Sequence, residues 1–384
     1  MKRRNPAWLD SFAQADEQTI PARLIRSRDP NRGPCTAREL GLDERRSADG
    51  PLVSVIIPTC DDSEYIPDAL ESIGGQTYGN LEVIFVDSSG VQWIEGLAEE
   101  CQWIRYISKQ PQGVSAARNE GIARASGEYI ALLDADDYWH PEKIERQVRA
   151  LQRGSDASYT CHYFIKFWGN DDPVIKVRDC PPDSKDTAYV ETFTGGITAH
   201  TSTLMFRSSA VSDRPFDVSM DHFEDVVFAV ELFKTHPPEY LSDPLSVRRL
   251  REGSLADRTS QEAKRRHRIR AYNDLSRRHP ELLPYATRMK AVEEFKRGWA
   301  ALERGDDTEA RRCFKRCLRY RPSHYKAMGV YAAALLPLDG RTVCRTLDRA
   351  FSTVRDRLDG RHADDATDRD RVITVLGQQS DGSL

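Results

Sequence analysis

The stretch "YIALLDADDYWHP", Tyr129–Pro141, passes from apolar residues into three acids, Asp134, Asp136 and Asp137. Its apolar part predicts a buried strand, so the acids should project from the strand's carboxyl end. Clustered carboxylates repel one another and are costly to desolvate. A divalent cation removes that cost, and Mg²⁺ or Mn²⁺ prefers hard oxygen ligands. We therefore predict a metal site here. Capping of the helix that begins near Pro141 is the alternative, but capping accounts for one acid rather than three.

The elements around this stretch predict where the acids lie. Short apolar runs at 52–57, 81–87 and 103–108 read as buried strands, and the spacing at 63–74 and 114–125 is helical. Alternating strands and helices of this length predict an α/β fold with a mostly parallel central sheet. In open sheets of this kind, ligands bind at the carboxyl ends of the strands. The acids that end the fourth strand, "EYIALLDADD", therefore fall where a ligand is expected.

Several motifs in order carry a family resemblance: "VSVIIPTC", "NLEVIFVDSSG", "GVSAARNEG" and "YIALLDADDYWHPEKI". Together they resemble the inverting family 2 glycosyltransferases, which have the GT-A nucleotide-sugar-binding fold. The match runs from Val53 to Gln147 almost without gaps, and more weakly to Ser254. The resemblance implies transfer of a sugar from a nucleoside diphosphate sugar, most simply a UDP-sugar, to an acceptor hydroxyl.

The resemblance also implies which residues hold the donor. Asp136 would bind Mn²⁺ or Mg²⁺ at the donor diphosphate, with Asp134 near the ribose and the metal. Arg118 would pair with donor oxygens or hold the acidic turn through a carboxylate. Arg251 stands where family members often have His, and its guanidinium could still clamp a diphosphate. The expected donor-binding residues are Pro58, Thr59, Asp87, Arg118, Asp134, Asp136 and Arg251.

The base-binding part of that set departs from the family pattern. Thr59 and Asp87 match the positions that hold the nucleotide base, and a carboxylate can accept the imide N–H of uracil. From the residues alone, Asp87 could equally be a strand-end cap. The family usually has "VDDGS" where this chain has "VDSSG", so the first acid is kept and Ser88 replaces the second.

The segment "MDHFEDVVFAVELF", residues 220–233, resembles the family's acidic motif that carries the general base. That role falls on Asp225, with Glu224 beside it on the acceptor side. A carboxylate facing a sugar hydroxyl can take its proton while C1 is attacked. Capping of a helix N-terminus by acids is the alternative. The segment "HTSTLMFRSSAV" matches a part of the family near the acceptor, so His200 and Thr201 are expected to line that pocket.

Two other functions fit parts of the pattern. A nucleotidyltransferase acting on sugar phosphates also uses acids at strand ends, but its first strand normally leads into a loop rich in Gly, Arg and Lys, and "PTCDD" is not one. A catalytically degenerate scaffold with a helical interaction region is the second alternative. Retention of Asp87, Asp134, Asp136 and Asp225 together argues against it.

The 384 residues are long enough for two domains, and we expect four segments. Residues 1–50 form a flexible N-terminal extension, 51–255 the glycosyltransferase domain, 256–358 a helical region and 359–384 a disordered tail. Residues 294–322 resemble one tetratricopeptide repeat, with Gly298, Ala310, Phe314 and Pro322 at consensus positions. One repeat cannot bury its own apolar face, so this region should dock on its own chain, on a protein partner or on a second copy.

Charge is unevenly distributed although the net charge is only -4. Residues 248–326 hold 23 Lys and Arg against 11 Asp and Glu, an excess of about 12 positive charges. This suits an anionic membrane surface and a lipid-linked or cell-surface glycan acceptor, or else solvated helix faces. The eight scattered Cys fit a reducing compartment, and no apolar stretch is long enough to cross a bilayer. We expect a cytoplasmic protein, peripheral on the inner face of the membrane, that binds no nucleic acid.

Overall fold

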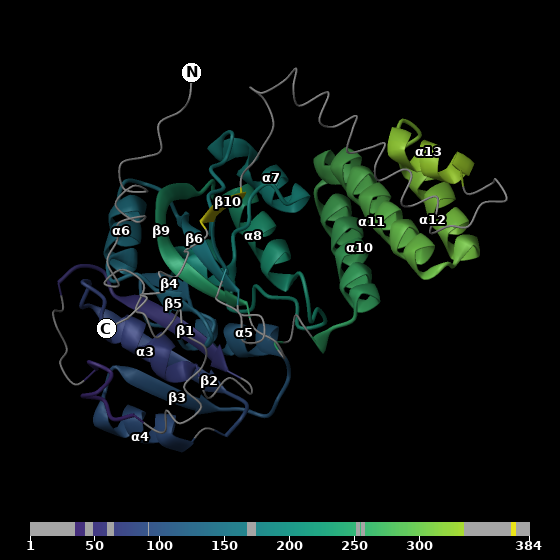
Figure 1. The fold of residues 1–384 in the computed structure, drawn as a ribbon. Coiled ribbons are helices and arrows are strands. Elements are labelled where there is room, and N and C mark those ends of the chain that lie inside the picture. The colour runs from purple at the N-terminus through teal and green to yellow at the C-terminus, as the bar shows by residue number, and fades with distance from the viewer. Residues whose placement is uncertain are drawn as a thin grey trace, which may run out of the picture. The chain divides into compact units, whose positions relative to one another are not determined.

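The computed structural model describes residues 35–42, 49–59, 65–90, 92–166, 174–250, 254, 258–333 and 370–373. The chain forms two compact units (Figure 1). The first comprises residues 1–259 with 369–384, and the second comprises residues 260–368. Arg251, expected to contact the donor, lies outside the described residues.

Four parallel strands build one half of the sheet in the first unit, in the order β3, β2, β1, β4. Their bounds are β1 Val53–Thr59, β2 Leu81–Asp87, β3 Ile104–Ser108 and β4 Tyr129–Leu132. The strands are joined through helices α3 (Ile66–Gly74), α4 (Gln92–Glu100) and α5 (Val114–Arg124). Thr59 pairs with Asp87, and Asp87 pairs with Ser108, so three strands end in register. The expected strands and helices of this half are confirmed.

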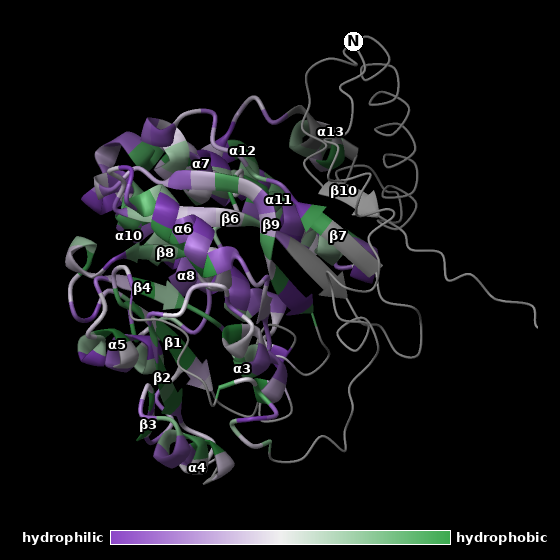
Figure 2. Ribbon diagram, turned by 90° about the vertical axis from the view of Figure 1, so that its left-hand side faces the viewer, coloured by the Kyte–Doolittle hydropathy of each residue, from purple (hydrophilic) through white to green (hydrophobic). Residues whose placement is uncertain are grey.

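Alternate side chains of the central strands enter two different cores, one on each face of the sheet. Val55 and Ile57 join the cluster that contains residues of α3 and α4, whereas Ile56 joins the cluster on the other face. A strand buried on both faces must be mostly apolar, and β1 and β2 are largely green in Figure 2, although Glu82 and Asp87 of β2 are acidic. Gly121 of α5 lies directly over β1, because a Cβ at that position would meet Ile56 Cγ2 at 2.3 Å. The missing side chain therefore sets how closely α5 approaches the sheet.

The other half of the sheet is mainly antiparallel. β8 (Met205–Arg207) joins β4 to β6 (Ala157–Lys166), which also pairs with β7 (Val174–Arg178). The long strand β9 (Glu239–Leu250) runs parallel to β6 and antiparallel to β5 (Tyr138–Trp139). Helices here are α6 (Lys143–Leu151), α7 (Ala188–Thr194) and α8 (Glu224–Thr235), with single 3₁₀ turns at Lys185–Thr187, Thr201–Thr203 and Ser208–Ala210.

Both terminal expectations differ in part from the structure. Residues 35–42 are packed rather than flexible, because Ala37, Leu40 and Leu42 are buried in the core. The Leu42 carbonyl also accepts a hydrogen bond from Trp103 Nε1 at 3.3 Å. Within the tail expected to be disordered, Asp370–Ile373 form β10, antiparallel to β7. An open strand edge offers unpaired backbone groups, and a short β-branched segment can pair with them.

The second unit is helical in its described part. It contains α10 (Gln261–Arg278), a 3₁₀ turn at Pro280–Leu282, α11 (Leu283–Arg304), α12 (Asp307–Tyr320) and α13 (Tyr325–Ala333). Gly298 of α11 faces Phe314 of α12, where a Cβ would lie 2.8 Å from the ring. Gly305 ends α11 in the left-handed conformation, with φ of 80°. These are the tight-packing and turn positions of the tetratricopeptide-like pattern.

Among the described helices, none has the length and apolarity needed to cross a membrane.

Candidate active site

The acidic turn after β4 is fixed by a buried arginine. Arg118 of α5 donates to Asp134 Oδ1 at 2.7 Å and to Glu224 Oε1 at 2.9 Å, and it is only 3% exposed. Burial by itself lowers the pKa of Arg118, but the charges of Asp134 and Glu224 outweigh it and the net shift is upward. One guanidinium thus joins the end of β4 to the first turn of α8, residues 90 positions apart in the sequence.

Asp134 is held ionised by these contacts. Burial raises its pKa, but the charge of Arg118 acts against burial, and the net shift is downward. Thr201 Oγ1 also donates to Asp134 Oδ2 at 2.9 Å. A buried carboxylate with an arginine and a hydroxyl on it stays charged and keeps one geometry. Asp134 is therefore an oriented, permanently negative group at the strand end.

The next two acids are not compensated in the same way. Burial and the neighbouring charge of Asp134 raise the pKa of Asp136 to about 6. Burial, followed by Asp136 and Asp134, raises the pKa of Asp137 well above its usual range. Asp137 accepts hydrogen bonds from Ser202 Oγ at 2.5 Å and from the Arg249 amide at 3.1 Å. Like charges in one turn thus oppose full ionisation, which is the situation that a bound cation relieves.

A set of possible metal ligands lies in this turn. Ligand atoms of Asp134, Asp137 and His200 lie within 4.8 Å of one another in the described part of the chain. The His200 ring nitrogens are 3.4 Å from Asp134 and 3.5 Å from Asp137, and burial lowers the pKa of His200 well below its usual range. A neutral imidazole and two carboxylates suit Mn²⁺ and, with more oxygen ligands, Mg²⁺. Asp136, the ligand expected from the sequence, is beside this group but not in it.

The two residues expected to hold the nucleotide base, Thr59 and Asp87, differ in their hydrogen bonding. Thr59 is 3% exposed, and its hydroxyl has no hydrogen-bond partner among the described residues. Asp87 is fully buried and accepts from the Ser89 amide and hydroxyl, the Gly90 amide and the Tyr106 hydroxyl at 2.6–2.9 Å. A carboxylate accepts about four hydrogen bonds, so Asp87 is saturated by its own turn and by Tyr106 of β3. Pro58, the residue before Thr59, is a buried β1 residue.

The first turn of α8 carries the expected catalytic acid. Phe223, which precedes it, has φ of 70°, a conformation that L residues with large side chains rarely adopt. Glu224 is buried against Arg118, whereas Asp225 is half-buried and accepts the Val226 amide at 2.8 Å. Asn119 secures the approach to this turn, since its side chain exchanges two hydrogen bonds with the Phe216 backbone, at 2.8 and 2.9 Å. Adjacent residues of α5 therefore hold the acidic turn and the α8 segment.

The structure assigns contacts that the sequence motifs did not show. His200 and Thr201, expected near the acceptor, both contact Asp134 of the acidic turn. Asp137 was not singled out as a ligand, although it belongs to the same acidic motif. Arg249 was also missed: its guanidinium contacts Asp68 at 3.0 Å and lies over the Tyr65 ring, while its amide binds Asp137. Only pairing of β9 with β5 brings Arg249 to this turn, so spacing in the sequence could not reveal it.

Comparison with known proteins agrees with this geometry. Residues 54–212 match the model of the glycosyl transferase family 2. EpsH of Bacillus subtilis (strain 168), named as a glycosyltransferase, is 26% identical over 219 residues, which cover 54% of this chain and 63% of EpsH. The uncharacterized glycosyltransferase alr2836 of Nostoc sp. is 33% identical over 149 residues, 37% of this chain and 46% of that protein. The chain thus spans less than two thirds of the length of these curated relatives.

Solved structures share the fold at low sequence identity. The S. aureus TarS 1–349 structure in complex with UDP-GlcNAc is 16% identical with a TM-score of 0.55, covering 78% of this chain and 91% of TarS 1–349. The mannosyltransferase PcManGT of Pyrobaculum calidifontis, in complex with GDP-Man and Mn²⁺, is 17% identical with a TM-score of 0.50, covering 81% and 88%. The expected GT-A fold is confirmed. Residues 54–212 of this chain thus match the glycosyl transferase family 2, and they lie in a GT-A fold that is followed in the chain by a helical unit.

Proposed function

We propose that this protein is an inverting glycosyltransferase that uses a nucleoside diphosphate sugar, with UDP as the carrier, and a divalent cation. One observation supports this most strongly: Arg118 binds both Asp134 of the acidic turn and Glu224, the neighbour of Asp225. The expected donor-side acid and the turn that carries the expected base are thereby joined by one buried side chain. Such pre-organisation is what a displacement between two bound substrates requires.

The donor would lie across the strand ends, with its base at β1 and β2 and its diphosphate at the acidic turn. The Thr59 hydroxyl is buried without a partner in the described residues, so a base or ribose oxygen would satisfy it. Uracil's imide N–H would reach Asp87 by replacing one of its four present donors. We propose the Ser89 hydroxyl as the group replaced, because Ser89 is exposed at the end of the turn. Pro58, Arg251 and Asp136 complete the proposed donor set.

Mn²⁺ or Mg²⁺ would be held by Asp136 with Asp134, and the position of Asp137 and His200 makes them further candidates. When bound, the cation supplies Lewis-acid stabilisation of the leaving diphosphate. The chain's own contribution is to keep Asp134 ionised through Arg118 and to orient it through Thr201.

Asp225 would act as the general base. Its carboxylate takes the proton of an acceptor hydroxyl as that oxygen attacks C1 from the face opposite the diphosphate, which inverts the anomeric configuration. Glu224, neutralised by Arg118, would hold Asp225's turn on the acceptor side, and His200 and Thr201 would connect that side to the acidic turn. The acceptor is proposed to be a lipid-linked or cell-surface glycan.

Donor hydrolysis and transfer test the proposal directly. Purified full-length protein is incubated with UDP-linked and GDP-linked sugars, with Mn²⁺, with Mg²⁺ or with EDTA, and nucleotide release is measured. Metal-dependent release of UDP from at least one UDP-sugar is expected. Release from GDP-sugars alone would contradict the UDP assignment, and equal rates with EDTA would contradict the metal. Binding of UDP without release from any donor would favour a catalytically degenerate scaffold.

A further inference from the structure

The basic residues of the helical unit differ in whether they are paired with acids of the same unit. Many of its arginines are neutralised within the unit: Arg268 binds Glu293 through two hydrogen bonds of 2.8 and 3.0 Å, and Arg316 binds Glu294 at 3.1 Å. Both glutamates are buried, at 3% and 5% exposure. These pairs hold helices together, so the cations in them are not free to recruit a ligand. Fewer of the basic residues between 248 and 326 are therefore available to a ligand than the charge count in the sequence suggests.

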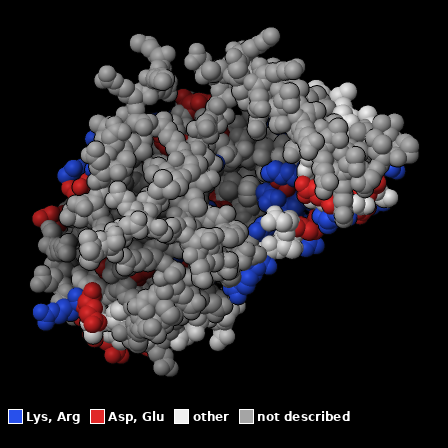
Figure 3. Space-filling view, in the orientation of Figure 1, with Lys and Arg blue, Asp and Glu red and all other residues white. Residues whose placement is uncertain are grey.

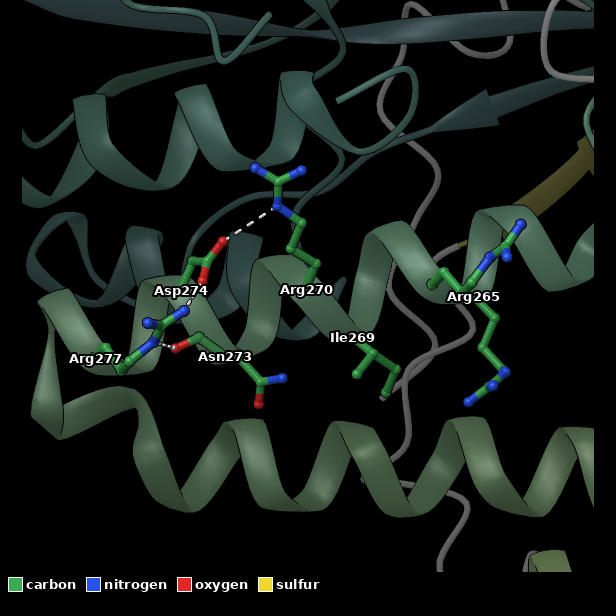
Figure 4. A pocket seen from close by; sticks show the side chains of 7 residues that line it. Arg265, Ile269, Arg270, Asn273, Asp274 and Arg277 are labelled. Carbon is green, nitrogen blue, oxygen red and sulfur yellow. Dashed lines mark hydrogen bonds and ion pairs between the residues drawn. The ribbon is translucent and has the colours of Figure 1, made fainter. Parts of the chain in front are cut away.

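One face of α10 keeps its positive charge outward. Arg266, Arg270 and Arg277 are exposed, and they line a hollow of about 310 Å³ together with Arg265, Ile269, Asn273 and Asp274 (Figure 4). Lys and Arg side chains gather, with some acids beside them, on the part of the surface that includes α10 (Figure 3). At about 100° per residue, the three exposed arginines fall within roughly 40° of one another around the helix. We call these three residues the arginine stripe.

The stripe is linear, and one acid lies beside it. From Arg266 to Arg277 it extends over about 16 Å of helix, at ~1.5 Å per residue. Asp274 is shared by Arg270, at 3.5 Å, and by Arg277, as the dashed lines in Figure 4 show. Arg266 forms no ion pair with a described side chain. Three exposed guanidiniums spaced along a line match a chain of repeated anionic groups better than a single ion. Guanidinium binds both carboxylate and phosphate through paired hydrogen bonds.

The side chains that α10 exposes favour an anionic glycan over a single-stranded nucleic acid or a membrane surface. A single-stranded nucleic acid is usually bound by aromatic side chains on which bases stack, yet the tyrosine of α10, Tyr272, is buried. An interfacial helix buries an apolar face in the membrane, yet α10, all of whose residues are described, has no exposed large apolar side chain. The residues that line its hollow are charged or polar apart from Ile269. An anionic glycan needs neither stacking nor insertion.

We propose that the arginine stripe of α10 binds a linear glycan that carries carboxylate or phosphate groups, and that this polymer is the acceptor. The identification as acceptor rests on the proposed function, whereas the binding does not. The stripe would raise the local concentration of acceptor ends by holding the polymer away from the reacting hydroxyl. Such binding is multivalent and weakens as salt rises.

Fluorescence anisotropy with the full chain tests the proposal. The probes are labelled polygalacturonate, polyphosphate and neutral dextran at low and high salt, with single-stranded RNA and anionic vesicles as further arms. The stripe variant carries Arg266→Ala, Arg270→Ala and Arg277→Ala. The matched control carries Arg311→Ala, Lys315→Ala and Arg319→Ala, which removes the same charge from exposed positions of α12. Circular dichroism and UDP binding establish that each variant is folded.

The wild type is expected to bind at least one of the two anionic polymers but not dextran, and the stripe variant to bind about tenfold more weakly than the control. Preference for polygalacturonate or for polyphosphate identifies the anionic group. Equal loss in both variants, or tighter stripe-dependent binding to RNA or vesicles, would overturn the proposal. Donor hydrolysis without acceptor should be unchanged in the stripe variant. If the wild type binds polymer but hydrolyses no donor, the proposed function fails while the binding surface stands.

Discussion

Individual residues at the acidic turn differ in role because their environments differ. Asp134 is paired with Arg118 and stays ionised, whereas burial and the charge of Asp134 raise the pKa of Asp136 to about 6. The first acid is thus oriented and kept charged by the protein, whereas the pKa of the second stays raised although the charges of Arg249 and Arg248 lower it. This contrast argues for a cation at the turn more directly than the count of acids does.

The first prediction concerns that cation. Asp136→Ala removes a hard ligand, so the affinity for UDP in Mn²⁺ should fall by about tenfold or more, as measured by calorimetry. Asp213→Ala, at an exposed position of the same unit, serves as control and should bind UDP as the wild type does. Unchanged affinity in the Asp136 variant, together with no effect of EDTA on the wild type, would remove Asp136 from the metal site.

The second prediction concerns the base. Asp225→Asn is nearly isosteric but cannot accept a proton, so turnover should fall by roughly 10² or more while UDP affinity is kept. Asp221→Asn, an exposed acid shortly before α8, should leave turnover unchanged. If the Asp225 variant keeps turnover within a few-fold of the wild type, a different residue deprotonates the acceptor, and Glu224 is the next to test.

At the scale of elements, α5 determines whether the site is assembled. Consecutive residues Arg118 and Asn119 reach the acidic turn and the Phe216 backbone, respectively. Both contacts depend on how closely α5 packs against β1, and Gly121 permits that close packing. A helix displaced outward by a side chain would move both contacts together.

The third prediction follows from this contact. Gly121→Ala places a Cβ 2.3 Å from Ile56 Cγ2, so the free energy of unfolding of the first unit should fall by about 1–3 kcal/mol. Gly96→Ala, a helical glycine with open space around it, should instead stabilise α4 by about 0.5–1 kcal/mol. Ile56→Ala removes the side chain that the new Cβ would meet. The double variant Gly121→Ala/Ile56→Ala should therefore lose less stability than the sum of the two single variants. Additive losses in the double variant would show that the contact does not limit the packing.

At the scale of the whole molecule, the sheet buries ionisable groups whose stability contribution depends on pH. His162 of β6 is 1% exposed, and burial, followed by the charges of Arg248 and Arg178, lowers its pKa to about 3. Between that value and about 6.5, the unfolded chain binds a proton at this residue and the folded chain does not. Stability should therefore fall as the pH falls through this window, by up to ~1.4 kcal/mol per pH unit from this group.

The fourth prediction isolates that contribution. His162→Gln cannot titrate, so the pH dependence of stability between pH 6.5 and 4 should be shallower than in the wild type. Hydrogen exchange at the β6 amides measures the stability of the strand itself, which avoids treating two units as one transition. An identical slope in the two proteins would show that His162 is protonated equally in the folded and unfolded chain.

Local periodicity and motif spacing are properties of neighbouring residues, so the amino-acid sequence alone predicts the strand–helix alternation, the acids at the strand ends and the family motifs. It could not determine which distant residues meet. The antiparallel strands bring Arg249 to Asp137, the Thr201 turn reaches Asp134, and Arg118 joins two motifs far apart in the chain. Nor could net charge reveal that Arg268 and Arg316 bind buried glutamates whereas Arg266, Arg270 and Arg277 are exposed on α10. Those outcomes depend on long-range pairing and on burial, which only the tertiary structure decides.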